Sequence, residues 1–86
     1  MFQATEIKRL IEEALPGARA DILDEANDGE HFSGEVVSPT FVGRSLVQQH
    51  QEVYRALGPR MGREIHALAL KTFTPEAWQT AGRDKP

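Results

Sequence analysis

The sequence predicts a small α+β domain in which helices pack on one face of a three-stranded sheet. Apolar residues recur at helical spacing in residues 3–15 and 45–57, whereas residues 18–23 and 31–38 alternate between apolar and polar side chains. Residues 64–72 form a short apolar run, which is typical of a buried strand. Because so few helices cannot cover both faces of three short strands, we expect the second face to be partly open.

Length and composition predict a single small globular domain. The 86 residues are 40% hydrophobic and 27% charged, and a chain of this length buries only a modest core. We assign residues 1–81 to the domain and expect residues 82–86 to form a polar tail. No apolar run approaches the roughly 20 residues that span a bilayer, and no secretory signal is recognisable. We therefore expect a cytoplasmic protein without a membrane segment.

The first helix is expected over residues 3–15. Its apolar residues fall at i, i+3, i+4, i+7 and i+8 and so share one stripe: Ile7, Leu10, Ile11, Ala14 and Leu15. Thr5 is the expected N-cap, because its hydroxyl can accept a hydrogen bond from a free backbone N–H of the first turn. Pro16 and Gly17 end the helix.

Two strands follow, and we expect them to pair as an antiparallel hairpin. The first covers residues 18–23 and has the alternation of a half-buried edge. The second covers residues 31–38, and one of its faces carries three small or apolar positions: Phe32, Gly34 and Val36. His31 falls on the other face. The connecting loop, residues 24–30, is acidic and has a turn signal at residues 27–29.

The second helix is expected over residues 45–57. Ser45 and Gln48 fit a capping box, in which each side chain bonds the backbone N–H of the other residue. Six residues form the predicted buried stripe: Leu46, Val47, His50, Val53, Tyr54 and Leu57. The Gly-Pro pair at 58–59 ends the helix, and a short helical turn is expected over residues 59–63.

The third strand is expected over residues 64–72. Alternation predicts that one face carries Ile65, Ala67 and Ala69. The other face would carry His66, Leu68 and Leu70. Thr74 is the expected N-cap of a last short helix, with Pro75 in its first turn and Trp78 packing it onto the sheet. The predicted order is α-β-β-α-(α)-β-α.

The net charge of −3 hides an asymmetry along the chain. Residues 1–35 carry nine acids and three bases, whereas residues 36–86 carry seven bases and four acids. The asymmetry is compatible with two solvated faces of opposite sign. The alternative is a docking surface whose positive half attracts an acidic partner.

An ordered series of short motifs resembles the BolA family. The series comprises His31-Phe32, Val36-Val37-Ser38, Phe41-Val42-Gly43, Val47-Gln48-Gln49-His50-Gln51, Val53-Tyr54, Leu57, Ile65-His66-Ala67-Leu68 and Thr74-Pro75-Glu76-Ala77-Trp78. The resemblance covers about residues 3–80. It implies a BolA-like fold similar to a class II KH domain, with the same order of elements.

His66 is the first candidate for chemistry, because a strand holds a side chain at a fixed angle. A histidine in this context could be satisfied by a backbone carbonyl, or it could serve as a metal ligand or proton carrier. The resemblance to BolA-like proteins implies the metal role: a histidine before Ala-Leu is a ligand of an iron–sulfur cluster.

His31 is the second and weaker candidate. Asp28 and Glu30 are expected to favour its charged form, which cannot bind metal. The resemblance implies a second cluster ligand from this loop. In some relatives that ligand is a cysteine two residues before the position of His31, where this chain has Gly29, so the role falls to His31. We expect His50 to be a packed helix histidine and not a ligand.

The chain has no cysteine, so it offers neither a disulfide nor a thiolate ligand. Iron–sulfur clusters are held mainly by cysteine thiolates, with histidine as an occasional replacement. The resemblance implies that a monothiol glutaredoxin supplies one thiolate and its bound glutathione another. We therefore expect a [2Fe–2S] cluster only in that complex, none in the isolated chain, and a role in cluster assembly, trafficking or iron sensing.

Two other functions remain open at this point. The resemblance to BolA-like proteins also implies a DNA-binding regulator of stress response and cell morphology as an alternative. The contacts would then come from four arginines: Arg44, Arg55, Arg60 and Arg63. We expect weak DNA binding, because the Gly-x-x-Gly loop of a KH module is missing. The third possibility is an adaptor that binds glutaredoxin without metal. No catalytic constellation is recognisable, so we do not expect an enzyme.

Overall fold

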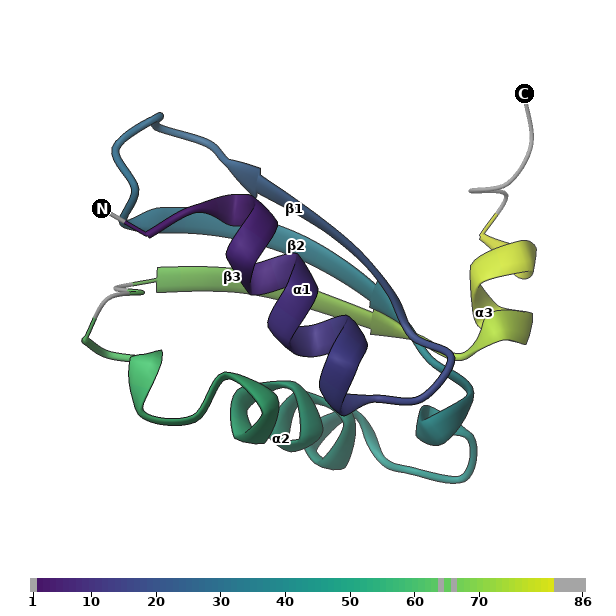
Figure 1. Cartoon of the computed structure of the whole chain (residues 1–86). Helices are drawn as coiled ribbons and strands as arrows, with labels where there is room; N and C mark the ends of the chain where they lie inside the picture. Colours follow the sequence, from purple (N-terminus) through teal and green to yellow (C-terminus); the bar gives the residue numbers. More distant parts are fainter. Residues whose placement is uncertain (1, 64, 66, 82–86) are drawn as a thin grey trace.

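Helices and strands follow one another in the order predicted from the sequence. The computed structural model describes residues 2–63, 65 and 67–81. Its elements are the helices α1 (Ala4–Ala14), α2 (Leu46–Leu57) and α3 (Pro75–Thr80), the strands β1 (Arg19–Asp24), β2 (His31–Val37) and β3 (Ala67–Phe73), and the 3-10 turns η1 (Pro39–Phe41) and η2 (Gly58–Arg60). The predicted α+β class is confirmed. Figure 1 shows α1 lying across the strands and α2 running beside β3.

The three strands form one sheet in the order β1-β2-β3. As predicted, β1 and β2 pair antiparallel, whereas β2 and β3 pair in parallel after the crossover through α2. The predicted faces of β2 are confirmed, because Phe32, Gly34 and Val36 are buried while the residues that alternate with them are half-buried or exposed. Alternation along β2 therefore separates a core face from a second, open face.

The core lies between the sheet and the two longer helices. Its buried apolar side chains come from α1, the sheet, η1, α2 and the segment before β3: Ile7, Ile11, Leu15, Ala20, Phe32, Val36, Phe41, Val53, Leu57, Ile65 and Leu68. Burying one large aliphatic or aromatic side chain contributes about 1.5–3 kcal/mol. This cluster therefore provides the main stabilising contacts of the domain.

Helix α1 begins earlier than its predicted cap. Gln3 is the N-cap, and its carbonyl accepts hydrogen bonds from the N–H groups of Glu6 and Ile7 at 3.0 and 3.2 Å. Thr5 lies inside the first turn, so its assignment as N-cap was wrong. No side chain caps the helix. Instead, burial of Ile7 and of Ile11, one turn further along, determines where the helix lies. Ala14, predicted in the apolar stripe, is exposed.

Both other predicted N-caps are confirmed. The Ser45 hydroxyl accepts from the Gln48 N–H at 3.2 Å, and the Gln48 side-chain oxygen accepts from the Ser45 N–H at 2.9 Å. This capping box opens α2 as expected. Thr74 caps α3 by accepting from the N–H of Ala77 at 3.1 Å.

The predicted buried stripe of α2 is wrong in part. Three of its members are exposed: Leu46, Val47 and Tyr54. Two polar residues, Gln49 and Glu52, are buried instead. The hydroxyl of Thr72 on β3 donates to Gln49 at 2.7 Å, and that of Thr40 donates to Glu52 at 3.0 Å. These hydrogen bonds fix which side of α2 faces the sheet.

Strand β3 begins later than predicted. Its ladder with β2 starts at Ala67, and Ala67 is exposed while Ile65 is fully buried, so these two residues do not share a face. The N–H of Ile65 donates to the carbonyl of Arg60 at 3.0 Å, which holds this segment in a turn before the strand. Glu64 and His66, which the prediction included, lie outside the described residues.

Helix α3 packs against the end of the sheet through Trp78, as predicted. The indole meets the ring of Phe73 edge-on, with 5.1 Å between ring centroids, and the Arg19 guanidinium lies 5.9 Å from the indole centroid. Arg19, Val37 and Phe73 are register partners across the sheet. Trp78 therefore covers one end of the face that α1 and α2 leave open. None of the described helices is long and apolar enough to cross a membrane.

Candidate functional site

His31 lies where the acidic loop enters β2, and carboxylates of the loop hold its backbone. Asp24 accepts from the N–H groups of Asp28 and Gly29 at 3.2 and 2.9 Å. Asp28 in turn accepts from the N–H groups of Glu30 and His31 at 2.9 and 3.0 Å. The loop is therefore an ordered turn that presents the His31 side chain, 59% exposed, to solvent.

The His31 ring is oriented by Asp28. Its Nδ1 lies 2.7 Å from the Asp28 carboxylate, and this hydrogen bond raises the pKa of His31 above its ordinary value. The same contact lowers the pKa of Asp28 to about 2. The expectation that the loop favours the charged imidazole is thus confirmed.

The second ring nitrogen of His31 is available for a ligand. Its Nε2 has no hydrogen-bond partner among the residues that the structure describes. Metal-binding histidines commonly donate their other ring N–H to a carboxylate, which fixes the tautomer and the ring orientation. The Asp28–His31 pair has this arrangement, so the His31 side chain fits a ligand role in its neutral form, with protonation as a competitor.

The register of the parallel pair connects His31 with the start of β3. His31 is the register partner of Ala67, and the N–H of Ala67 donates to the carbonyl of Glu30 at 3.1 Å. Ala67 directly follows His66 in the sequence. His66 itself, the stronger predicted ligand, lies outside the described residues.

Within residues 2–63, 65 and 67–81, no three histidine, aspartate or glutamate side chains gather into a group that could hold a metal ion. Among these residues, the candidate metal ligand is therefore a single imidazole, that of His31, which Asp28 orients. Such a donor fits a shared metal site, in which other molecules supply further ligands.

His50 is packed in α2, as predicted. It is half-buried, and its ring meets that of Tyr54 edge-on with 6.3 Å between centroids.

The four arginines of the alternative nucleic-acid site are spread along α2 and beyond it: Arg44 precedes the helix, Arg55 lies in its last turn, and Arg60 and Arg63 follow it. Arg44 and Arg55 line a hollow of about 370 Å³ that also contains the Glu52 carboxylate, which lies 3.5 Å from the Arg44 guanidinium. Arg60 lies five residues after Arg55, in the turn η2 that follows the helix, and Arg63 comes three residues later.

The charge of Arg60 acts on a carboxylate of α1. The pKa of Glu6 is lowered mainly by its hydrogen bond with Arg9, and the nearby charge of Arg60 contributes to the same shift. Two of the four arginines thus have a carboxylate nearby, Glu52 for Arg44 and Glu6 for Arg60. These carboxylates partly neutralise the positive charge.

Sequence reasoning missed a polar network that joins α2 to the sheet. The Gln49 amide donates to the Arg44 carbonyl at 3.0 Å and accepts from the Thr72 hydroxyl. The only sequence signal is that Glu52 and Val53 follow Gln49 by three and four residues, so both lie next to Gln49 on the helix surface. The partners of Gln49 and Glu52 lie elsewhere in the chain, so local spacing could not identify them.

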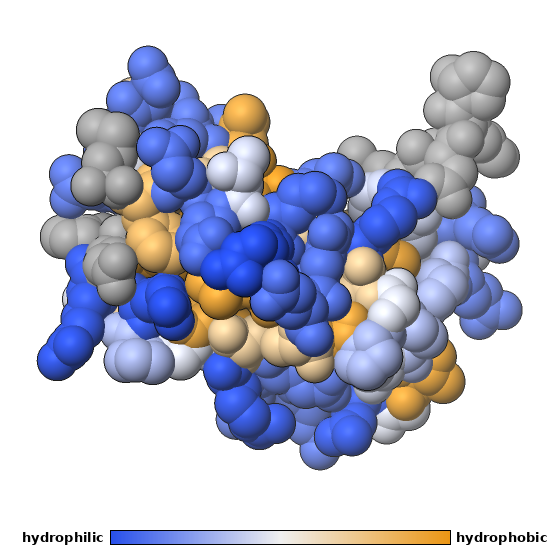
Figure 2. Space-filling view, in the orientation of Figure 1, coloured by the Kyte–Doolittle hydropathy of each residue, from blue (hydrophilic) through white to orange (hydrophobic). Residues whose placement is uncertain are grey.

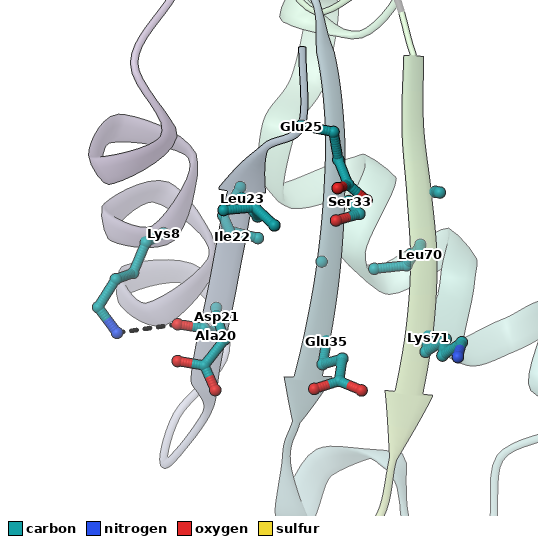
Figure 3. A pocket seen from close by; sticks show the side chains of 12 residues that line it. Lys8, Ala20, Asp21, Ile22, Leu23, Glu25, Ser33, Glu35, Leu70 and Lys71 are labelled. Atoms are coloured by element: carbon teal, nitrogen blue, oxygen red, sulfur yellow. Dashed lines mark hydrogen bonds between the residues drawn. The ribbon is translucent and has the colours of Figure 1, made fainter. Parts of the chain in front are cut away.

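A larger hollow, of about 710 Å³, lies over the open face of the sheet (Figure 3). Figure 3 views the strands from this face, with Leu23, Ser33 and Glu35 on β1 and β2 and Lys71 on β3. The lining does not include His31. Its mixture of acidic, basic and aliphatic groups converges on no reactive centre, so the hollow is separate from the candidate ligand.

Comparison with known proteins decides the family. A family model described as BolA-like protein matches residues 12–77. The chain belongs to the BolA-like protein family. The resemblance drawn from the motif series is therefore confirmed.

BolA relatives match in both sequence and structure. The DNA-binding transcriptional regulator BolA of Haemophilus influenzae is 39% identical over 66 residues, which cover 74% of this chain and 64% of that protein. Protein BOLA2 of Arabidopsis thaliana is 31% identical over 86 residues, with 98% and 91% covered. A solved bolA protein homologue from Coxiella burnetii superposes with a TM-score of 0.79 at 40% identity, covering 92% of this chain and 99% of that one.

This chain thus spans slightly less than two thirds of the Haemophilus protein. BolA-family proteins carry the names of regulators or of BolA-like proteins and not of enzymes.

Proposed function

We propose that the chain pairs with a monothiol glutaredoxin and shares a [2Fe–2S] cluster with it, in iron–sulfur assembly and trafficking or in iron sensing. The observation that carries the proposal is the register of the parallel strands, which places His31 beside Ala67, the residue after His66. The oriented imidazole of His31 thus lies beside the first residue of β3, which follows the candidate histidine in the sequence.

The donor chemistry supports a shared site. His66 and His31 would supply imidazole nitrogens, and the chain has no cysteine to complete a set of four terminal ligands. The glutaredoxin cysteine and its glutathione would supply the two thiolates. Neutral imidazoles in place of thiolates change the charge and the potential of a cluster.

Reconstitution tests the proposal. The chain is mixed anaerobically with a monothiol glutaredoxin, glutathione, iron and sulfide, and visible absorption and circular dichroism are recorded. We expect a spectrum that differs from that of glutaredoxin alone. His66→Ala should remove this difference, His31→Ala should shorten the cluster lifetime, and the matched control His50→Ala should leave both unchanged. An unaltered spectrum in His66→Ala would contradict the ligand assignment.

A second candidate function is DNA binding, which the name of the Haemophilus relative favours. Arg44, Arg55, Arg60 and Arg63 would then contact phosphates; they follow one another from the start of α2 to the segment after η2. Because carboxylates accompany these arginines and the net charge is −3, we expect dissociation constants no tighter than micromolar at physiological salt.

Fluorescence anisotropy with a labelled duplex between about 50 and 200 mM salt separates the candidates. A nanomolar complex that depends on base sequence would favour the regulator.

A further inference from the structure

The candidate ligand His31 lies on the face of the sheet that α1 and α2 leave open. Alternation along β2 places its side chain on the same face as that of Ser33. The register joins three residues of this face in one row across the strands: Leu23, Ser33 and Ala69. We call these three residues the middle row. His31 and Ala67 form the next row, at the end of the sheet.

The middle row adjoins His31 directly. Ser33 follows His31 by two residues and so lies about 7 Å further along the same strand. Leu23 is the register partner of Ser33, which makes it a diagonal neighbour of His31 at about 7–8 Å. Among the described residues of the three strands, Leu23 is the only exposed large apolar side chain, at 59%.

Small side chains turn the middle row into the floor of a hollow. Ser33 and Ala69 line the hollow of about 710 Å³ on this face, and Leu23 borders it on β1 (Figure 3). The row on the side away from His31 also lines the hollow, and it is charged: Asp21, Glu35 and Lys71. An apolar centre with a charged border is the usual composition of a protein–protein interface.

The other face of the sheet is already covered. Helices α1 and α2 lie on it, and the core cluster fills the space between them and the strands. Figure 2 shows this covered face, where hydrophilic side chains of α1 lie in front of the sheet. Several of them form ion pairs with one another: Lys8 with Glu12, and Arg9 with Glu6 and Glu13.

One end of the open face is covered as well. Trp78 of α3 packs on Phe73, and Arg19 lies over its ring. These contacts occupy the end of the sheet opposite His31, because Arg19 and Phe73 belong to the last row of the register. The part of the open face that no described helix covers is therefore the part that adjoins His31.

The His31 imidazole defines both the position and the chemistry of a partner. Its Nε2 has no hydrogen-bond partner among the described residues, and the chain has no cysteine. A metal cluster bound there needs thiolates from another molecule. A stable protein interface buries about 800 Å² on each partner, which corresponds to a patch of about 16 Å radius. A patch of that size around His31 on this face includes the middle row.

We propose that the partner that supplies the thiolates docks on the open face and inserts an apolar side chain into the hollow, against Leu23 and Ala69. The inference rests on the proposed function, because it takes the same monothiol glutaredoxin as the partner. It adds a docking surface that is separate from the metal ligands. A side chain that fills a pocket near the centre of an interface commonly carries much of the affinity. The middle row thus holds the partner, whereas His31 contacts the metal.

The test measures binding and cluster formation separately. Five proteins are compared: the parent chain, Leu23→Asn, Ala69→Arg and the matched controls Val47→Asn and Ala14→Arg, which make the same changes at exposed positions of α2 and α1. Anaerobic calorimetry with a monothiol glutaredoxin and glutathione, with and without iron and sulfide, gives the dissociation constants. Circular dichroism follows the cluster. Thermal unfolding checks the fold, and Ala69→Gln replaces Ala69→Arg if the latter unfolds.

We expect both middle-row variants to bind at least about tenfold more weakly than the parent, as for the loss of a central interface contact. Both controls should bind like the parent. Because the middle-row variants keep the metal ligands, the complex that they form at high concentration should retain the cluster spectrum of the parent. This result would distinguish the docking surface from the ligand His31.

Four outcomes separate this proposal from the proposed function. Equal affinity of the parent and both middle-row variants would overturn the docking surface, and a cluster spectrum in those mixtures would leave the shared cluster intact. A parent that binds through the middle row without forming a cluster would contradict the shared cluster alone. Absence of any binding would overturn both. A dimer in sedimentation experiments that Ala69→Arg dissociates would assign this face to a second copy of the chain and overturn the docking surface.

Discussion

The carboxylate of Asp28 holds both the ring and the backbone of His31. One oxygen lies 2.7 Å from Nδ1 of the imidazole, and the other accepts the His31 N–H at 3.0 Å. A single side chain thus sets the protonation and the orientation of the candidate ligand. This relationship leads to two predictions that can be checked without any partner.

Asp28→Asn should lower the pKa of His31. The amide oxygen can still accept the backbone hydrogen bonds of the turn, so the loop should keep its shape while the ring loses its charged partner. NMR titration of the imidazole protons measures the effect, with His50 as the internal reference. A His31 midpoint that is unchanged in Asp28→Asn would show that the ion pair does not form in solution.

Stability and metal binding should depend on pH in opposite directions at this pair. Because the pKa of His31 is raised in the fold, the pair stabilises the loop fully below about pH 6.5, and this contribution fades as pH rises through the raised value. The contribution of the pair also fades as the pH falls toward about 2, the pKa of Asp28, because the carboxylate becomes protonated there. The protection of the loop amides from hydrogen exchange should therefore be greatest where the pair is fully charged and should decrease toward both higher and lower pH.

Ligation through Nε2 needs the neutral ring, so it should weaken as pH falls through the raised pKa. Asp28→Asn should shift that midpoint to lower pH. Cluster lifetime in the mixed complex, followed against pH, measures it. An identical profile in the parent and in Asp28→Asn would mean that His31 is not a ligand.

Much of the fold could be predicted because its determinants are local. Alternation identified the faces of β2, and the spacing of Ser45 and Gln48 identified the start of α2. The acids around His31 likewise indicated its charge.

The errors concern contacts between distant parts of the chain. The buried side chains of Gln49 and Glu52 accept hydrogen bonds from Thr72 and Thr40, and no periodicity within α2 indicates those partners. With these polar residues facing inward, Leu46 and its apolar neighbours face outward. The parallel register that joins His31 to Ala67 is equally nonlocal, so the sequence indicated each candidate residue without showing which strand ends meet.

Thr72→Val should destabilise the domain, because it removes the hydroxyl that donates to the buried Gln49 amide oxygen. An unsatisfied buried group costs about 1–3 kcal/mol. The double variant Thr72→Val/Gln49→Met removes both polar partners and should recover part of that loss.

Urea unfolding measures these differences, and Thr5→Val is the matched control, since Thr5 is exposed and does not cap α1. We expect the control to lie within about 0.5 kcal/mol of the parent. A Thr72→Val variant as stable as this control would show that the hydrogen bond contributes nothing.

Gly34→Ala tests a close approach inside the sheet. A Cβ atom at Gly34 would lie 2.7 Å from Cδ1 of Ile22 on β1, which is too close for two carbon atoms. Two effects compete here. Overpacking costs about 1–3 kcal/mol, whereas replacing glycine stabilises by about 0.4–1 kcal/mol through the unfolded chain. We expect overpacking to prevail, because Ile22 already packs against the core cluster.

Ile22→Val removes the clashing methyl group, so the sign of the alanine effect should reverse in that background. In the parent, Gly34→Ala should lower the free energy of unfolding; in Ile22→Val it should be neutral or raise it. The four proteins form a double-mutant cycle that urea unfolding can measure. If the alanine costs the same in both backgrounds, the Ile22 methyl group is not the obstacle, and backbone geometry within β2 would be the reason for glycine at this position.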